Sequence, residues 1–301
     1  MNIEQLNAKY GIAGQIEFIT GKGGLPMIQV NSPKAKALIS IHAGQVLSFK
    51  PNNEPEDVLF LSDKAYYQDG KAIKGGAPIC WPWFGSDPEG KGRPGHGFVR
   101  NRPWNVVATE AKANGDIKIT LGLVDTPEIQ EIWLHSFVLT QEIIISDALN
   151  LSLITCNIGK EKFSITQAFH TYFKVGSIAQ AKVLGLEGCR YIDKVDNSAQ
   201  KQQSGPVTIS SEVDRIYLDV GNTLTIDDSA LNRRIQITSQ GSKTAVVWNP
   251  WEKISIEMAD LEDADYQRLL CVETTNAAND VVEVAPGGEC RLTANYQVIR
   301  S

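Results

Sequence analysis

The segment FVLTQEIII, residues 137–145, followed after three residues by LNLSLITCNI, residues 149–158, decides the fold. Both segments are rich in apolar and β-branched residues, and the second places Leu149, Leu151 and Leu153 at every other position. A period of two is that of a β-strand with one buried face. The pair therefore predicts two neighbouring strands of a sheet.

Short stretches of the same kind continue on both sides of this pair and are separated by turn residues. They are residues 26–30, 37–41, 58–62, 104–109, 117–124, 233–239 and 244–248. Asn114-Gly115 lies between two of them and predicts a type I′ hairpin turn, in which both residues have positive φ. Many short strands at regular spacing indicate an all-β sandwich or a related large β architecture, and they disfavour a βαβ fold.

Two short segments are expected to be helical. Thr126–Leu134 has Pro127 in place for a first helical turn, and Leu261–Leu270 has acidic residues early and Arg268 late. A proline in the first turn suits a helix, and so do acidic residues near its start with a basic residue near its end. Both segments are short, so helices are expected to be a minor part of the fold.

No boundary between domains is visible in the sequence. GKGG at 21–24 lacks the spacing of a phosphate-binding loop and is interpreted as a hairpin turn. Residues 196–206 are the most loop-like stretch, but strand-like sequence continues on either side, and neither an internal repeat nor a low-complexity linker divides the chain. We therefore expect one domain over residues 1–301.

Composition limits the classes of function. Of 301 residues, 42% are hydrophobic and 21% are charged, which is typical of a globular protein. No apolar run approaches ~20 residues and the N-terminus has no signal-peptide pattern, so we expect no membrane contact and a cytoplasmic location. A net charge of −6 argues against nucleic acid as a partner.

The five cysteines have neither disulfide-framework nor metal-site spacing. They are widely separated, with no CxxC pair and no Cys/His cluster of zinc-finger spacing. We expect reduced thiols, mostly buried. The chain also lacks a GxSxG elbow and an HExxH helix, which disfavours a serine hydrolase of that type and a zincin.

Residues 74–100 suit a ligand cleft because glycines and prolines exclude a long helix while aromatic and cationic residues accumulate. The aromatic rings are those of Trp81, Trp83 and Phe84, which suit either a sugar-binding wall or a core. His96 is titratable. The cations available to an anionic ligand are Lys74, Arg93 and Arg100.

His170 and Glu273 are the candidates for acid–base chemistry. His170 ends a strand-like segment among aromatic residues, whereas His42 and His135 lack nearby polar residues and are interpreted as structural. Glu273 lies in the apolar run LLCVETTN, where a charged residue is costly unless it is paired or functional. Each residue alone suits a buried structural hydrogen bond equally well, and the case for catalysis depends on the carboxylate reaching the histidine.

Six segments in order carry a family resemblance: KGGAPICWPWFG, GHGFVRNRPW, QAFHTYF, SEVDRIY, VVWNPW and CVETTN. Together they resemble the aldose 1-epimerase superfamily, and most closely its hexose-6-phosphate mutarotase, or glucose-6-phosphate 1-epimerase, branch. The match spans about residues 25 to 296. The resemblance implies an all-β galactose-mutarotase-like supersandwich with a few short helices, a monomer, a sugar-phosphate substrate, and no metal or organic cofactor.

The resemblance also implies residue roles. His170 falls on the general acid that protonates the sugar ring oxygen, and Glu273 falls on the general base that takes the proton of the anomeric hydroxyl. His96 and Asp214 fall on positions that bind the ring oxygen and the sugar hydroxyls. Lys74 and Arg100 fall on cationic positions for the phosphate.

One base and one acid suffice for such a reaction, because ring opening needs only loss of the O1 proton and protonation of the ring oxygen. At ordinary pKa values Glu273 is ionised, and a neighbouring carboxylate keeps His170 protonated. Lys74 departs from the branch, which has an arginine before the two glycines; Arg93 is a second candidate for that role. Free hexoses as substrates, a non-catalytic sugar-binding protein, and a lyase or hydrolase on a related sandwich remain alternatives.

Overall fold

The strand pair that decides the fold forms the middle of a large antiparallel sheet. The computed structural model describes residues 1–300. Within it β8 (Phe137–Ile145) pairs with β9 (Ala148–Asn157), and buried residues alternate with more exposed ones along β8. The alternation of the sequence is thus the alternation between the core face and the solvent face of the sheet.

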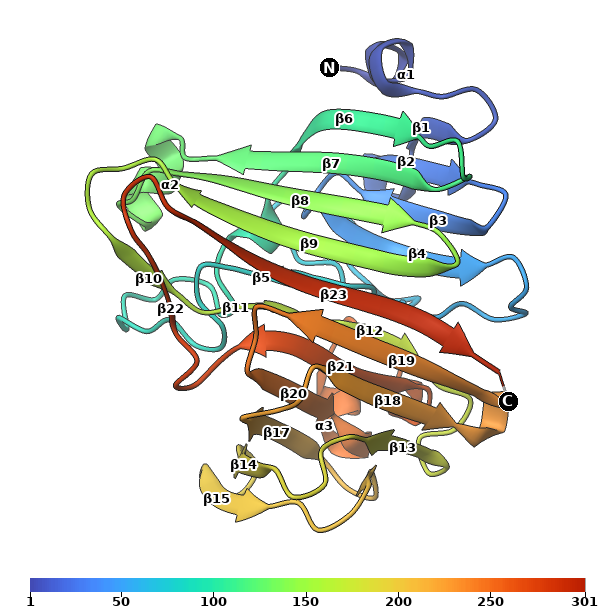
Figure 1. Cartoon of the computed structure of the whole chain (residues 1–301), viewed down its shortest axis with the longest axis vertical. Coiled ribbons are helices and arrows are strands. Elements are labelled where there is room, and N and C mark those ends of the chain that lie inside the picture. Colours follow the sequence, from blue (N-terminus) through green and yellow to red (C-terminus); the bar gives the residue numbers. More distant parts are fainter. Residues whose placement is uncertain (301) are drawn as a thin grey trace.

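Nine strands make up this sheet, which runs down the front of Figure 1. In spatial order they are β16 (Val207–Thr208), β13 (Ala181–Leu184), β18 (Thr223–Asp228), β19 (Arg233–Gln240), β23 (Glu289–Ile299), β9, β8, β7 (Ile117–Val124) and β6 (Asn105–Ala111).

A second sheet of eight strands lies behind the lower half of the first in Figure 1. Its order is β15 (Ala199–Gln202), β14 (Arg190–Asp193), β17 (Val213–Leu218), β20 (Thr244–Asn249), β21 (Leu269–Asn276), β11 (Gln167–Phe169) and β5 (Ile79–Cys80), with β12 (Tyr172–Lys174) also paired to β21.

Two smaller sheets complete the β structure, and every strand pair in the described chain is antiparallel. One has the order β1 (Ile16–Thr20), β2 (Pro26–Asn31), β3 (Ala35–Ser40) and β4 (Gln45–Pro51); the other pairs β10 (Phe163–Ile165) with β22 (Val282–Val284). Sequence order and pairing both exclude βαβ units, as the sequence predicts.

The core lies between the nine-stranded sheet and the other layers. One continuous cluster of buried side chains includes Phe18 of β1, Leu151 of β9 and Val272 of β21. Two hydrogen bonds join the layers directly: the Trp81 indole N–H donates to the Thr155 hydroxyl at 3.0 Å, and the hydroxyls of Thr171 and Tyr296 lie 2.6 Å apart. The sandwich architecture expected from the sequence is confirmed.

Helices are short and peripheral. The α-helices are α1 (Ile3–Tyr10), α2 (Pro127–Ile132) and α3 (Trp251–Glu257), and the 3₁₀ turns are η1 (Lys22–Gly24), η2 (Val99–Asn101), η3 (Ser229–Leu231) and η4 (Asp265–Gln267). α2 confirms the prediction for Thr126–Leu134, with Thr126 as its N-cap and Pro127 in the first turn. α1 begins with a capping box formed by Asn2 and Gln5, which the sequence interpretation overlooked.

Some local predictions are wrong. Residues 58–62 form only isolated bridges, because the Phe60 N–H donates to Tyr172 whereas the Ser62 N–H donates to Lys74, so no single partner strand follows the segment. The predicted helix Leu261–Leu270 is reduced to η4, because β21 pairs the segment's last two residues with β12.

Two turn predictions also need correction. Of Asn114 and Gly115 only Gly115 has positive φ, and its N–H donates to Lys112, so the turn is type I followed by a left-handed glycine. Residues 196–206 contain β15, which pairs with β14. The hairpin turn predicted at 21–24 is confirmed, since η1 joins the paired strands β1 and β2.

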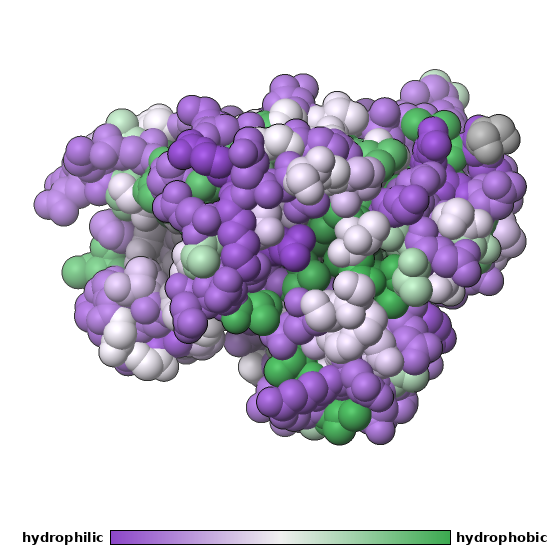
Figure 2. Space-filling model, turned by 90° about the horizontal axis from the view of Figure 1, so that it is seen from below, coloured by the Kyte–Doolittle hydropathy of each residue, from purple (hydrophilic) through white to green (hydrophobic). Residues whose placement is uncertain are grey.

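The surface and the thiols add two observations. Figure 2 shows a lower face that is mostly hydrophilic, with hydrophobic residues in small patches, and no helix in residues 1–300 has the length and apolar character needed to cross a membrane.

All five cysteines are free. Only Cys80 and Cys271 are fully buried, and the other three are half-buried, so the expectation of mostly buried thiols is wrong.

Candidate active site

One cavity of about 600 Å³ lies against the eight-stranded sheet and brings together all six residues that the sequence singled out for a site. They come from five separate parts of the chain, and they are Lys74, His96, Arg100, His170, Asp214 and Glu273. Such a meeting of residues far apart in sequence is what a substrate site requires.

The register of three neighbouring strands builds one wall of the cavity. Asp214 on β17 pairs with Trp248 on β20, and Trp248 pairs with Cys271 on β21. Two residues further along β21, Glu273 pairs with Val246 of β20. Residues two apart on a strand share a face, so Cys271 and Glu273 point to the same side of the sheet.

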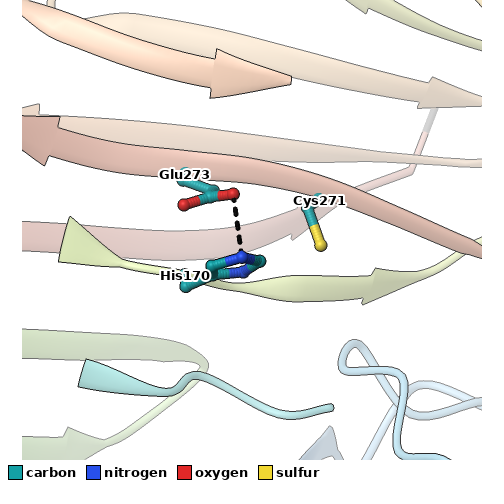
Figure 3. A group of neighbouring side chains, drawn as sticks. All are labelled: His170, Cys271 and Glu273. Atoms are coloured by element: carbon teal, nitrogen blue, oxygen red, sulfur yellow. Dashed lines mark ion pairs between the residues drawn. The ribbon is translucent and has the colours of Figure 1, made fainter. Parts of the chain in front are cut away.

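His170 lies in the break between β11 and β12. On either side of the break Phe169 pairs with Thr274 and Tyr172 pairs with Cys271, so the same register sets His170 opposite Glu273. Its Nε2 is 3.4 Å from Glu273 Oε1, and Figure 3 shows the imidazole ring and the carboxylate facing one another. The carboxylate therefore reaches the histidine, which is the condition that the sequence left open.

The residues after His170 alternate between the cavity and the core. Thr171 points into the core, where its hydroxyl meets that of Tyr296, and Tyr172 returns to the cavity. The Tyr172 ring stacks on the His170 ring at 4.9 Å and 14°. The imidazole is thus held by an aromatic face on one side and a carboxylate on the other.

Burial disfavours the charged form of both members of this pair. It raises the pKa of Glu273 well above its usual value, and it lowers the pKa of His170 well below its usual value, a shift that His96 and Arg100 increase. Both shifts run against the sequence expectation of ordinary pKa values, with an ionised glutamate and a protonated histidine, so that expectation is wrong.

His96 is neutral in the structure, and its hydrogen bond sets its tautomer. Burial, with Arg100 and Lys74 nearby, lowers its pKa to about 3. The Gly85 N–H donates to His96 Nδ1 at 3.3 Å, so Nε2 carries the proton and is a donor. The backbone here is tightly folded: His96 has φ 63°, and a Cβ at Gly97 would lie 1.8 Å from the Trp81 carbonyl oxygen.

Three cations line the cavity, and the sequence interpretation identified two of them. Lys74 Nζ is 3.5 Å from Asp260 Oδ1. Arg100 donates through Nη2 to the Gly95 carbonyl at 3.1 Å, and its buried Nε has no partner among the described residues. The third cation is Lys194, just after β14, for which the sequence offered no signal.

Arg93 lies outside the cavity lining. Its guanidinium is 2.5 Å from Asp87 and 2.9 Å from Glu89, and it covers the Trp83 ring at 4.2 Å. These contacts use its charge and its planar face, and they fold the loop before His96. The structure therefore does not place Arg93 with the other candidate phosphate ligands.

The aromatic residues of segment 74–100 divide between core and cavity. Trp81 and Trp83 are buried in the core, whereas Phe84 lines the cavity together with Trp248. Asp214 lines the same cavity, and burial raises the pKa of its carboxyl. His42 and His135 do not line the cavity, consistent with the structural roles expected for them.

Site residues that the sequence interpretation missed are Tyr172, Lys194, Met258 and Cys271. For Tyr172 a signal existed, because it follows His170 by two positions and shares its side of the chain. Cys271 has the same relation to Glu273. Its thiol, with the ligand atoms of His170 and Glu273, forms a group that could hold a metal ion.

Comparison with known proteins gives the family of the chain. Residues 26–297 match the aldose 1-epimerase family model. The chain is 38% identical over 258 residues to an Escherichia coli protein named "Putative glucose-6-phosphate 1-epimerase". The aligned region covers 84% of each chain.

Two solved structures place the fold. A crystal structure of a mutarotase homologue, YeaD, from Salmonella typhimurium has a TM-score of 0.90 at 32% identity and covers 99% of both chains. A galactose mutarotase-like protein from Clostridium acetobutylicum has a TM-score of 0.73 at 14% identity, covering 95% of this chain and 98% of its own. The fold is galactose-mutarotase-like, and the chain belongs to the aldose 1-epimerase family.

Proposed function

We propose that this protein is a glucose-6-phosphate 1-epimerase, which interconverts the α and β anomers of a hexose 6-phosphate. The observation that carries the proposal is the contact of 3.4 Å between His170 Nε2 and Glu273 Oε1 in a cavity that also holds three cations. An acid, a base and a place for an anionic group are the requirements of this reaction. The names of the curated relatives support the same substrate.

In the proposed reaction Glu273 takes the proton from O1 and His170 protonates the ring oxygen, so that the bond from C1 to the ring oxygen breaks and an open aldehyde forms. Rotation about the bond from C1 to C2 presents the other carbonyl face. The two proton transfers then run backwards and close the ring with the opposite configuration. No electrons are gained or lost, and both groups end as they began.

The pair carries one proton throughout this cycle. The closed sugar reacts with the carboxylate and the imidazolium, and the open aldehyde reacts with the carboxylic acid and the neutral imidazole. Burial favours the second arrangement, and the charges of Arg100 and Lys74 lower the pKa of His170 further. A bound phosphate dianion would offset those charges, and so favour the imidazolium that ring opening needs.

The remaining candidates are assigned to substrate binding. Asp214 and the His96 Nε2–H supply an acceptor and a donor for sugar hydroxyls and the ring oxygen. Lys74 and Arg100 are proposed to bind the phosphate, with Lys194 as a third cation at the same cavity. Phe84 and Trp248 offer apolar faces to the sugar ring.

The test is exchange between the two anomers of glucose 6-phosphate, measured by NMR with purified protein against buffer. We expect acceleration, and a loss of roughly 10²–10⁴-fold in Glu273→Gln and in His170→Ala, the range typical for removal of a general acid or base. Matched controls are Glu283→Gln, an exposed residue of β22, and His135→Ala, outside the cavity; both should keep the rate.

Other outcomes separate the alternatives. Equal kcat/KM for glucose and glucose 6-phosphate would make the protein an epimerase of free hexoses. Calorimetric binding of glucose 6-phosphate without exchange would make it a binding protein, and any product other than the anomer would indicate a lyase or hydrolase. Full activity in both Glu273→Gln and His170→Ala would remove the proposed residue roles.

We further propose that residues 1–301 act as one domain and as a cytoplasmic monomer. Support comes from the continuous buried cluster that includes residues of β1, β9 and β21. Light scattering of the purified chain should give the mass of a single copy, and cell fractionation should recover it with the cytoplasmic proteins. A stable dimer in solution would contradict the proposed monomer, and recovery with membranes would contradict the proposed location.

A further inference from the structure

We propose that His170, Cys271 and Glu273 form a binding site for a zinc-type divalent cation, and that its occupancy blocks proton transfer by His170 and Glu273. The ligand atoms of the three side chains all lie within 4.8 Å of one another, and all three residues are buried. It is the one group of this kind found in residues 1–300. The reaction proposed above uses only two of its members and leaves the thiol without a role.

The sheet holds the three side chains in place. Cys271 and Glu273 are two apart on β21 and so project on the same side, and His170 lies opposite Glu273 across the strand pair. Figure 3 shows the Glu273 carboxylate above the imidazole ring and the Cys271 sulfur to the right of the ring. All three therefore start from rigid backbone, which reduces the cost of gathering them around an ion.

The spacing requires only small movements. Zinc lies ~2.3 Å from a thiolate sulfur and ~2.0–2.2 Å from a histidine nitrogen or a carboxylate oxygen, which puts tetrahedral ligands roughly 3.3–3.8 Å apart. The His170–Glu273 contact of 3.4 Å is already in this range. Cys271 Sγ needs a shift of about 1 Å at most from the separation observed, which rotation of the side chains can supply.

The donors select the type of metal. One nitrogen, one sulfur and one oxygen suit zinc and its neighbours in the transition series, whereas magnesium and calcium prefer several oxygen ligands. His170 and Glu273 line the cavity, so the fourth coordination position faces it and remains open. The Cys271 thiol releases its proton to the solvent when the ion binds. Lys74 and Arg100 repel a dication, which limits affinity but does not remove the three ligands.

An ion in this site would inhibit the proposed epimerase, because it occupies the nitrogen of His170 and the oxygen of Glu273 that proton transfer needs. This consequence rests on the proposed function. Binding of the metal does not, so the two are tested by separate measurements.

Binding is measured on the full chain by calorimetry with zinc chloride and by absorption with cobalt(II), whose charge-transfer band reports a thiolate ligand. We expect one zinc ion per chain and a thiolate band. Cys271→Ala should abolish the band. It should also weaken zinc binding at least 10- to 100-fold, because loss of a hydrogen bond to a metal ligand already weakens a metal site by roughly that factor. His170→Ala should weaken zinc binding to a similar extent but keep the band.

Cys80→Ala is the matched control, since Cys80 is also fully buried but lies on β5, outside the group. It should bind zinc and cobalt as the unaltered protein does. Absence of stoichiometric zinc binding, or a thiolate band that persists in Cys271→Ala, would overturn the site. Should Cys271→Ala fail to fold, undiminished zinc affinity in His170→Ala would overturn it equally.

Inhibition is measured as anomer exchange at free zinc concentrations fixed by a metal buffer, because the substrate phosphate also binds metal ions. Each variant is compared with its own metal-free rate. We expect half-inhibition of Cys80→Ala to match the unaltered protein, and that of Cys271→Ala to require at least tenfold more free zinc, in line with the ligand loss. Zinc binding without inhibition would overturn only the blocking role, and no exchange in any sample would reject the proposed function while leaving the site intact.

Discussion

His96 and His170 lie in the same cavity, with ring centroids 5.5 Å apart, but their surroundings give them different tasks. His96 accepts a backbone hydrogen bond at Nδ1 and forms no ion pair with a carboxylate of residues 1–300, so it suits a neutral donor. His170 faces Glu273, with 3.4 Å between Nε2 and Oε1. The sequence does not distinguish the two histidines, but one polar neighbour beside each ring gives them different roles.

The low pKa of His96 predicts a loss of stability in acid. Its pKa falls from 6.5 in the unfolded chain to about 3 in the folded one, so between these values the unfolded state binds more protons and stability decreases as pH falls. At pH 5 this amounts to about 2 kcal/mol relative to pH 7.5. His96→Gln should lose less stability between pH 7.5 and pH 5 by about that amount.

Urea unfolding of both proteins at the two pH values measures the difference. Between pH 7.5 and pH 8.5, above the window, the two proteins should respond alike. An equal loss of stability at pH 5 would show that His96 titrates normally in the folded state.

Arg100 predicts a substrate-specific effect. Hydrogen bonds to charged groups contribute about 1.5–3 kcal/mol, so Arg100→Gln should raise KM for glucose 6-phosphate about 10- to 100-fold and change any reaction of free glucose much less. Arg190→Gln is the matched control, because Arg190 is an exposed arginine outside the cavity. If Arg100→Gln impaired the reactions of both sugars equally, Arg100 would instead contact the sugar ring or support folding.

At the scale of elements, the catalytic pair depends on one interrupted strand. β11 and β12 both pair with β21 in one register, and the break between them contains His170 and Thr171. The hydrogen bond of Thr171 to Tyr296 on β23 anchors this break to the nine-stranded sheet. The position of His170 is thereby fixed from behind, through a residue that never faces the cavity.

Tyr296→Phe should destabilise the fold by about 1–3 kcal/mol, because it leaves the buried Thr171 hydroxyl without its partner. The double variant Thr171→Val with Tyr296→Phe removes both polar groups and should regain most of that loss. Urea unfolding of the two single variants and the double variant measures the coupling. Strict additivity would contradict the anchoring role.

The local alternation of apolar residues predicted the strands well where each strand keeps the same neighbouring strand on each side along its length. β7 and β8 have the ends that the sequence indicated, because their alternation is sustained over eight or nine residues. Residues 58–62 failed because their hydrogen bonds change partner along the segment, and Leu261–Leu270 failed because pairing of β21 overrides a weak helical preference. Neither influence is local.

At the scale of the whole molecule, the aromatic segment joins the layers as well as lining the cavity. Trp81 is fully buried, packs on Phe137 with ring centroids 4.5 Å apart, and bonds to Thr155 of β9. Phe84, three residues later, lines the cavity and packs on His96. One short segment therefore serves both stability and binding.

Trp81→Ala and Phe84→Ala should have opposite signatures. Loss of the buried indole should cost about 3–5 kcal/mol of folding free energy, as for other large-to-small core substitutions. Phe84→Ala should cost less stability and raise KM for glucose 6-phosphate. Thermal unfolding together with steady-state kinetics tests both; a larger stability loss in Phe84→Ala than in Trp81→Ala would reverse the assignment.

The sequence by itself determined the β architecture, the family and the candidate site residues, because alternation and ordered motifs are written along the chain. It also marked Glu273, since a charged residue inside an apolar strand is costly unless it has a task. Only the tertiary structure decided that His170 meets Glu273, that Arg93 is held elsewhere, that Tyr172 and Lys194 join the cavity, and in which direction burial shifts the pKa of each member of the catalytic pair. Proximity and burial arise from contacts between distant segments, and they alone set the electrostatic environment of a side chain.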